Sequence, residues 1–446
     1  MTKKLNANST AGNASSVPGP GDDSSDSQQK ITAFTSLRIA NFRLQLTGSI
    51  LSNAAQWIQS VTLSWLVYDL TGSGTILGSI NLVRALASLF MIPLAGLLVD
   101  RLNRRMLITL ENSWLFVITL SLGLIVITGH VSVWHLFVFT FLGGIAQTVD
   151  TTLRQVLIFD LVPRSHAPNA VALIQTGWSI MRVVGPSIAG FLILWVGAGT
   201  NFLIQASVYV LVAITILQIK FPSQKTNPVT SSPLQNIKEG LHYVAQERVT
   251  RTFMLMGIIM PLLTIPIFSI LPAIYAVQVF GDKTGRVLGL LMAATGVGGI
   301  IGGLFLASLG RLEYRGRLQL LALFLLSLSL MAFAFTSNLV IALLCLTLAG
   351  FFEIIFLASN QTLLQLSIPN DLRGRVTAVV NLSSLITPVG ALIAGVGSDL
   401  LGGPKMITIV LTSLAAIIAI LIFLFSPTVR NYRFSRGIEG DRGAGN

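Results

Sequence analysis

Long apolar stretches recur through most of this chain, and each is long enough to cross a bilayer as a helix, which takes about 20 residues. Only 10% of the residues are charged, against about 25% in soluble proteins. The sequence therefore predicts an all-α polytopic membrane protein with twelve transmembrane helices. The predicted spans lie near residues 44–68, 75–99, 105–128, 132–160, 168–196, 200–220, 251–278, 285–309, 317–335, 338–366, 376–401 and 404–426.

The basic residues predict how these spans are oriented. The net charge of +12 suggests nucleic-acid binding at first, but the cations gather in alternate connections between the spans. Basic residues in short connections stay on the cytoplasmic side of a membrane. We therefore predict a plasma-membrane (inner-membrane) protein with both termini in the cytoplasm and no nucleic-acid partner. The connections on that side hold Arg101, Arg104, Arg105, Arg311, Arg315, Arg317, Arg373 and Arg375.

Polar segments divide the chain into five parts. Residues 1–34 are predicted to be a disordered cytoplasmic tail, and residues 429–446 a basic cytoplasmic tail. Residues 35–221 and 251–428 are predicted to be two six-helix bundles, related by weak similarity at an offset of about 206 residues, where Gly96 falls on Gly302. Between them, residues 222–250 are predicted to form a cytoplasmic linker with a surface helix, because apolar residues recur there at helical spacing.

The connection between the second and third spans is the most informative motif. Its spacing alone predicts a tight cytoplasmic hairpin. The pattern Gly-x-x-x-Asp-Arg-x-x-Arg-Arg resembles the loop between helices 2 and 3 of the major facilitator superfamily of secondary transporters. The resemblance implies that Asp100 faces the N-terminus of helix 11 and, with Arg101, latches the halves together in one transport state. A static anchoring role is the alternative for Arg104 and Arg105. The motif comprises Gly96, Asp100, Arg101, Arg104 and Arg105.

The fifth span contains a second motif, made of Gly177, Arg182, Gly185, Pro186 and Gly190. A Gly-Pro pair within a helix permits a bend and the close approach of a neighbouring helix. The segment resembles the Gly-Pro-x-x-Gly motif that is associated with exporters in the superfamily, although Ala189 departs from it. Ordinary packing of small residues is the alternative.

Ionisable residues within the spans are candidates for proton coupling or a cavity. Asp150 and Arg154 are four residues apart, so they share one helix face and can pair. A lone charge at the bilayer centre costs about 2.5–3.5 kcal/mol, so such residues usually face a cavity or a partner. Their segment resembles the Phe-Asp-x-Pro-x-Arg stretch of helix 4 in the enterobactin-exporter-like branch, with departures at Val149 and Thr152.

Glu353 is the acid that lies deepest in the second half. Burial favours the protonated form of a carboxyl, so Glu353 is a candidate to take up and release a proton. The alternative is a carboxyl that is hydrogen-bonded to a neighbouring Ser or Thr. Arg84 and Arg182 are the other deep cations, and either could hold the charge of an acid or face an anionic substrate. The aromatic candidates for a substrate cavity are Trp57, Trp178, Tyr275, Phe351 and Phe352, with packing or lipid contact as the alternative.

The sequence has no phosphate-binding loop, His-Glu-x-x-His or Cys-x-x-Cys pattern. We expect no cofactor, no metal site and no enzyme activity, with energy supplied by an ion gradient. The resemblance covers residues 37–426 and is closest to the enterobactin-exporter-like and macrolide-efflux-like branch, including Trp57-Ile58-Gln59. It implies the major facilitator fold and a monomeric, proton-coupled exporter of an amphipathic small molecule, of the drug or siderophore class, by alternating access. Alternatives are an uptake carrier or lysolipid flippase on the same fold, and a membrane scaffold or sensor.

Overall fold

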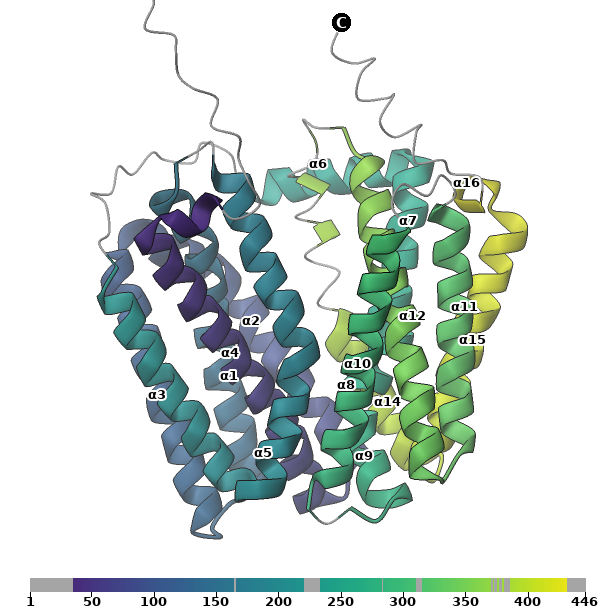
Figure 1. Cartoon of the computed structure of the whole chain (residues 1–446), viewed down its shortest axis with the longest axis horizontal. Helices are drawn as coiled ribbons and strands as arrows, with labels where there is room; N and C mark the ends of the chain where they lie inside the picture. The colour runs from purple at the N-terminus through teal and green to yellow at the C-terminus, as the bar shows by residue number, and fades with distance from the viewer. Residues whose placement is uncertain are drawn as a thin grey trace, which may run out of the picture.

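The computed structural model describes residues 35–430 apart from 164–165, 220–232, 283, 310–314, 370–371, 373–374, 377–378 and 381–385. The predicted N-terminal tail, residues 1–34, lies outside the described residues, as does the predicted C-terminal tail from residue 431 onward. The first two residues of that C-terminal tail, 429–430, are described and are helical. The described part is helical throughout and forms two groups of long helices that lie side by side (Figure 1). We call the end that carries the linker helix the inner end, because the charge pattern predicts that it faces the cytoplasm, and the opposite end the outer end.

Five long helices form the first group. They are α1 (Ala40–Thr71), α2 (Gly74–Arg101), α3 (Arg104–Ile127), α4 (Val133–Leu161) and α5 (Ala167–Leu217). The predicted fifth and sixth spans both lie within α5, which consists of two helices that meet at a kink at Gly197. The backbone there has a φ of 74°, a left-handed conformation that glycine adopts without a steric penalty. The kink falls between the two spans that the sequence predicts, at 168–196 and 200–220.

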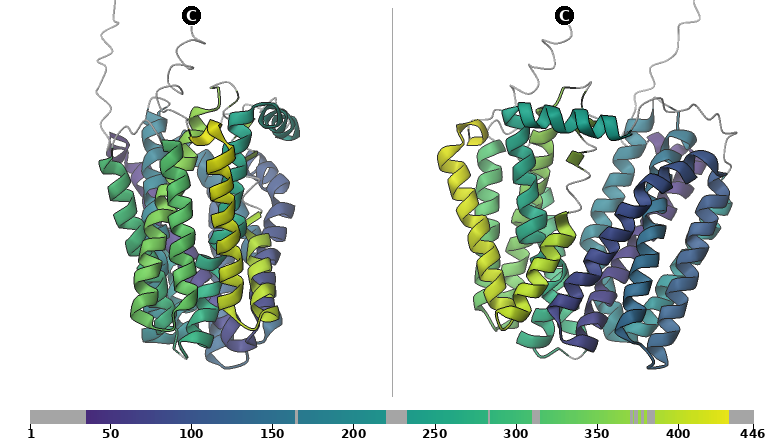
Figure 2. Two further views of the ribbon diagram at one scale, coloured as in Figure 1. Left: turned by 90° about the vertical axis from the view of Figure 1, so that its right-hand side faces the viewer. Right: turned by 180° about the vertical axis from the view of Figure 1, so that it is seen from behind.

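The linker helix α6 (Pro233–Gln246) lies across the inner end (Figure 2). It is held by the connection that follows the tenth span: Glu239 forms an ion pair with Arg375 at 3.0 Å, and the Tyr243 hydroxyl donates to the Ser367 carbonyl at 3.3 Å. The linker therefore contacts the second group of helices at the predicted cytoplasmic surface.

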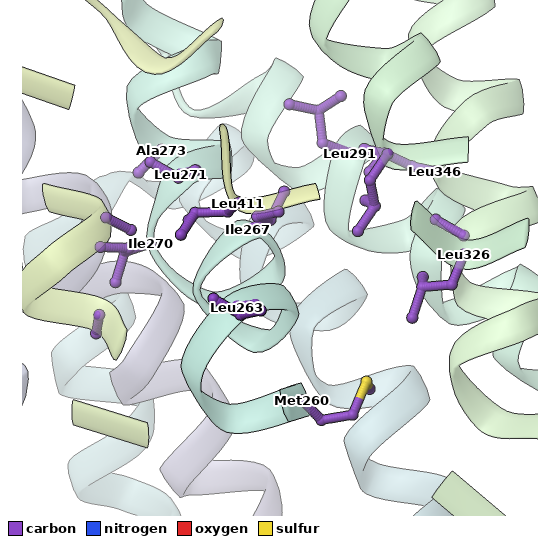
Figure 3. Packing of buried hydrophobic residues seen from close by; sticks show 14 of the residues in the cluster. Met260, Leu263, Ile267, Ile270, Leu271, Ala273, Leu291, Leu326, Leu346 and Leu411 are labelled. Atoms are coloured by element: carbon purple, nitrogen blue, oxygen red, sulfur yellow. The ribbon is translucent and has the colours of Figure 1, made fainter. Parts of the chain in front are cut away.

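The seventh span is broken into short pieces. It comprises α7 (Arg248–Ile259), a π-helical turn at Met260–Thr264, α8 (Ile265–Ser269), α9 (Leu271–Ile274) and a second π-helical turn at Tyr275–Val279. Pro261, Pro266 and Pro272 recur within it, and each removes a backbone donor from the helical ladder. Figure 3 shows Leu263, Ile267 and Leu271 of this span in the same buried cluster as Leu411.

The remaining helices of the second group are α10 (Arg286–Ser308), α11 (Arg315–Phe335), α12 (Leu339–Leu366), α14 (Ile386–Leu400), α15 (Pro404–Phe425) and the short α16 (Pro427–Arg430). Ten segments of the described chain are long and apolar enough to cross a membrane. The helix α1 is also long, but it carries polar residues that face the protein, and α14 is a shorter apolar helix. The predicted all-helical membrane architecture is confirmed.

Buried apolar side chains join the two groups at the outer end. One cluster contains Tyr68, Leu77 and Ile193 from the first group together with Ile274 and Leu288 from the second. At the inner end, the first group has a separate cluster of its own, which includes Phe42, Val99, Leu107, Leu157 and Ile216. The core is therefore continuous across the two groups near the outer surface.

Candidate functional site

A cavity of about 490 Å³ lies between α1, α4 and α5. It is in the inner half of the molecule, since Ile158 is one turn from the inner end of α4 and Val171 is near the start of α5. Hydroxyl and amide groups from α1 face aliphatic and aromatic side chains from α5, so the wall is both polar and apolar. The lining residues are Ser49, Ser52, Asn53, Gln56, Asp150, Thr151, Arg154, Gln155, Ile158, Val171, Ile174, Gln175 and Trp178.

Asp150 and Arg154 form an ion pair on the wall of this cavity. Arg154 Nε donates to Asp150 Oδ1 at 2.5 Å, and Ser52 Oγ donates to Asp150 Oδ2 at 3.3 Å. Asp150 is buried, and it lies 11 residues before the end of α4. That separation is about 16 Å along a helix, which is near the middle of a bilayer core about 30 Å thick. A pair of charges at this depth makes the cavity a candidate functional site.

A third charged residue, Glu111 of α3, belongs to the same cluster and was missed in the sequence. It is buried, and it interacts electrostatically with both Asp150 and Arg154. The Asn112 side chain donates to Glu111 Oε2 at 2.7 Å. The polar run Glu111-Asn112-Ser113 within the otherwise apolar third span was the signal that could have revealed it.

A second buried ion pair joins the two groups of helices. Arg182 of α5 donates from Nη2 to Glu353 Oε1 of α12. Glu353 is buried and lies halfway along α12, 14 residues from its start, whereas the Arg182 side chain is 37% exposed. The partner of Glu353 is therefore an arginine of the other half, as the sequence allowed for Arg182, rather than the alternative of a neighbouring hydroxyl. Arg84 has no ion pair among the described residues and lies near Tyr209 of α5.

The two groups are fastened together at the outer end by Asp399 of α14. Its carboxylate accepts hydrogen bonds from Ser73 Oγ and the Gly74 backbone N–H, both at 2.8 Å, and from the Thr75 N–H at 2.9 Å. These donors are the first residues of α2, so the carboxylate caps the positive end of that helix from across the molecule. We call this contact the outer clasp. No sequence motif had indicated it.

Closely packed glycines surround the outer clasp. A Cβ at Gly74 would lie 2.6 Å from the Gly395 carbonyl oxygen, and a Cβ at Gly78 would lie 2.8 Å from the Cα of Leu392. On the other side of the molecule, a Cβ at Gly190 of α5 would overlap the backbone of Gly289 in α10. The halves therefore meet backbone to backbone near the outer surface.

The glycines of the fifth-span motif also place α5 against α1. A Cβ at Gly177 would lie 3.1 Å from Ile50, and one at Gly185 would lie 2.7 Å from Trp57. Pro186 follows within the helix. Two motif glycines thus pack inside the first half, and the third packs against the second half.

The hairpin motif is anchored to its own half by its arginines. Arg104 forms an ion pair with Asp160 of α4, and Arg105 Nη2 donates to the Leu217 carbonyl of α5 at 2.8 Å. Arg101 is exposed, and a Cβ at Gly96 would meet nothing within 4 Å. The side chain of Asp100 and residues 381–385, just before α14, lie outside the described residues, so the predicted latch stays a prediction.

The aromatic candidates fall into two groups. Trp178 lines the cavity and is 47% exposed. The others pack within the protein. Trp57 lies against Gly185, Phe351 contacts the rings of Phe305 and Phe352, and Tyr275 is fully buried, with its hydroxyl 3.1 Å from Thr408 Oγ1. Tyr275, Phe351, Phe352 and Trp57 are not among the residues that line this cavity.

Solved structures of transporters share this architecture. A bacterial homolog of the human lysosomal transporter Spinster, in an inward-facing and unoccupied conformation, superposes with a TM-score of 0.67 at 16% identity, covering 88% of this chain and 97% of that chain. A D-xylose–proton symporter gives a TM-score of 0.66 at 14% identity, covering 88% and 98%. These similarities confirm the predicted major facilitator fold.

Curated relatives match along most of the sequence. The staphyloferrin A transporter of Staphylococcus aureus is 26% identical over 381 residues, covering 85% of this chain and 94% of that protein. The multidrug efflux pump Tap of Mycolicibacterium fortuitum is 26% identical over 398 residues, covering 87% and 96%. Macrolide efflux protein A of Streptococcus pyogenes is 22% identical over 363 residues, covering 80% and 88%.

A family model described as transmembrane secretion effector matches residues 31–432, which is nearly the whole chain. The predicted relationship to the major facilitator superfamily is confirmed. The chain belongs to the transmembrane secretion effector family of that superfamily, and it is a transporter rather than an enzyme.

Proposed function

We propose that this chain is a proton-coupled exporter of an amphipathic small molecule, of the drug or siderophore class, which works by alternating access. The observation that carries the proposal is the cavity between α1, α4 and α5, which lies in the inner half while the two groups of helices are fastened together at the outer end. A substrate that enters from the inner side and leaves after the outer contacts open would be exported.

The chemistry of the cavity wall supports an amphipathic substrate. Ser49, Asn53 and Gln56 offer neutral hydrogen-bonding groups on one side, and Ile174 and Trp178 offer apolar surface on the other. The relatives that match along most of the chain transport a siderophore, macrolides or several drugs, as their names state. Both observations favour a molecule with polar groups on an apolar frame.

The moving parts are part of the proposal. Residues 35–221 and 251–428 would rock as two bundles in the plasma membrane, with both termini in the cytoplasm. The Arg182–Glu353 ion pair lies between them at mid-depth, so it would break or change partners during the cycle. Asp100 and Arg101 would latch the inner end when the outer clasp is open.

Transport assays in a pump-deficient bacterium test the proposal. Cells that express the chain should accumulate less radiolabelled erythromycin, staphyloferrin A or ethidium than control cells, and a protonophore should abolish the difference. Inverted membrane vesicles should accumulate the same probe when their interior is made acidic. Unchanged levels of all three probes, or inward-only movement in whole cells, would refute export and favour a scaffold or an uptake carrier.

A matched pair of tryptophan variants tests whether the transported substrate uses the cavity. Trp178→Ala should reduce efflux, because it removes apolar surface from the wall. Trp134→Ala removes an exposed tryptophan at the outer end of α4, where the ring stacks on His135, and should leave efflux unchanged. If the two substitutions change efflux equally, the transported substrate does not bind in this cavity.

A further inference from the structure

The cluster of Glu111, Asp150 and Arg154 holds two carboxyl groups against one guanidinium. All three belong to the buried interior of the first half, and Glu111 interacts electrostatically with the other two. If both acids were ionised, the cluster would carry one unit of uncompensated negative charge. A lone charge at membrane depth costs about 2.5–3.5 kcal/mol. Binding one proton makes the cluster neutral.

The hydrogen bonds indicate which carboxyl holds that proton. Asp150 accepts from the guanidinium of Arg154 at 2.5 Å and from Ser52 at 3.3 Å, and both bonds stabilise its ionised form. Glu111 accepts only from Asn112, through Oε2 at 2.7 Å, and its Oε1 is buried without a hydrogen-bond partner among the described residues. Protonation therefore costs less free energy at Glu111 than at Asp150.

The groups that face Glu111 from the neighbouring helices support this assignment. They are Asp150 and Arg154 from α4 and Tyr209 from α5. Arg84 of α2 interacts with Tyr209 and is not among the groups that interact with Glu111. Tyr209 is neutral and accepts from Gln205 at 3.3 Å. The guanidinium that interacts with Glu111, that of Arg154, is paired with Asp150 through Nε, and neither of its Nη atoms donates a hydrogen bond to Glu111 among the described residues.

Glu353, a buried acid of the second half, differs from Glu111 in the charge that surrounds it. Glu353 is matched one to one by Arg182, so that pair has no excess charge for a proton to neutralise. The sequence offered Glu353 and Asp150 together as candidate acids for proton coupling. The geometry places that role in the first half, beside the wall of the substrate cavity, which Asp150 and Arg154 line.

We propose that Glu111 is the group that binds the coupled proton, in a site completed by the Asp150–Arg154 pair. This inference rests on the proposed proton-coupled export. Asp150 and Arg154 line the cavity and also interact electrostatically with Glu111, so they connect the cavity to the proton site. The bound proton and the substrate thus both lie beside the Asp150–Arg154 pair. This shared ion pair couples proton binding to substrate transport.

Infrared difference spectroscopy of the purified full-length protein in lipid tests the site without a substrate. Acidification should produce the carbonyl band of a protonated carboxyl in the wild type. This band should be lost in Glu111→Gln and retained in Glu353→Gln. It should also be retained in the surface control Glu239→Gln. A band that persists in Glu111→Gln, or that disappears in Glu353→Gln instead, overturns the proposal. Glu111→Asp serves as a second variant and should keep a band at a shifted frequency.

A proteoliposome assay then links the site to transport. Glu111→Gln should lose ethidium uptake driven by a pH gradient, down to the level of protein-free liposomes, but should still exchange ethidium across the membrane without a gradient. Retained exchange also shows that the variant is folded. If pH-driven uptake survives in Glu111→Gln, the proposal is wrong. If the wild type shows exchange but no pH-driven uptake, the proposed proton coupling fails, and the infrared titration still decides where a proton binds.

Discussion

Removing the carboxylate of the outer clasp should open the outer end of the transporter. In the described structure, Asp399 accepts three hydrogen bonds from the start of α2 and belongs to the other half of the molecule. A capping interaction at a helix N-terminus contributes about 0.5–2 kcal/mol. The site is exposed, so screening by water keeps the contribution of the charge modest. We therefore expect Asp399→Ala to destabilise the outer-closed form by about 1–2 kcal/mol, which changes the ratio of closed to open molecules by a factor of about 5–30.

Spin-label distance measurements can detect this change. Labels at His130→Cys and Leu401→Cys, both exposed at the outer end of different halves, would be introduced in a Cys345→Ala background, because Cys345 is the one cysteine of the chain. Asp399→Ala should enlarge the population at the longer distance. Asp399→Asn should have a smaller effect in the same direction, since an amide oxygen still accepts hydrogen bonds.

Asp282 offers a matched control for the outer clasp. It also lies at the outer end and accepts backbone hydrogen bonds at a helix start, from Val287 at 2.8 Å and Leu288 at 3.2 Å, but every partner belongs to its own half. Asp282→Asn should lower the thermal stability and leave the distance distribution unchanged. The reasoning is refuted if Asp399→Ala leaves the distribution as in the wild type, or if both substitutions shift it equally.

Three further substitutions test the contacts between the halves and the cavity pair. Gly190→Val should abolish efflux at normal expression, because the side chain would overlap the backbone of α10, whereas Gly303→Ala, with only ordinary contacts, should not. Arg182→Ala should lower the free energy of unfolding in detergent by about 1–3 kcal/mol, since a buried carboxylate loses its partner. Adding Glu353→Ala should restore part of this loss. If the effects of the two substitutions on the free energy of unfolding simply add, the pair does not interact. Asp150→Asn should reduce efflux while the protein still folds, as judged by circular dichroism, because it leaves a guanidinium unmatched on the cavity wall; unaltered efflux would remove this residue from the mechanism.

Local features of the sequence predicted the membrane architecture and one of the ion pairs. Hydropathy located the spans, and the spacing of Asp150 and Arg154 placed them on one helix face, because helical periodicity is a local property. The relationship to transporters followed from short motifs in one connection and three spans. The break predicted between the fifth and sixth spans falls at the kink at Gly197, where glycine adopts a left-handed backbone conformation without a steric penalty.

Contacts between distant segments could not be predicted in the same way. Arg182 and Glu353 are 171 residues apart, and Asp399 lies 325 residues from Gly74. Each residue looked unpaired in its own segment, and only the packing of the two halves supplies the partner. Glu111 was overlooked for a different reason: one acid in an apolar span has no partner at helical spacing, and its neighbours come from α4.

The helix α5 joins three features that were described separately. Trp178 at the cavity, Arg182 in the ion pair between the halves and Gly190 at the outer contact follow one another within 12 residues, which is about 18 Å of a single helix. A tilt of this one rod would move all three positions together. The cavity in the inner half and the contacts at the outer end would then change shape together. Because one helix connects them, the two ends would not be open at the same time, and the membrane would not leak.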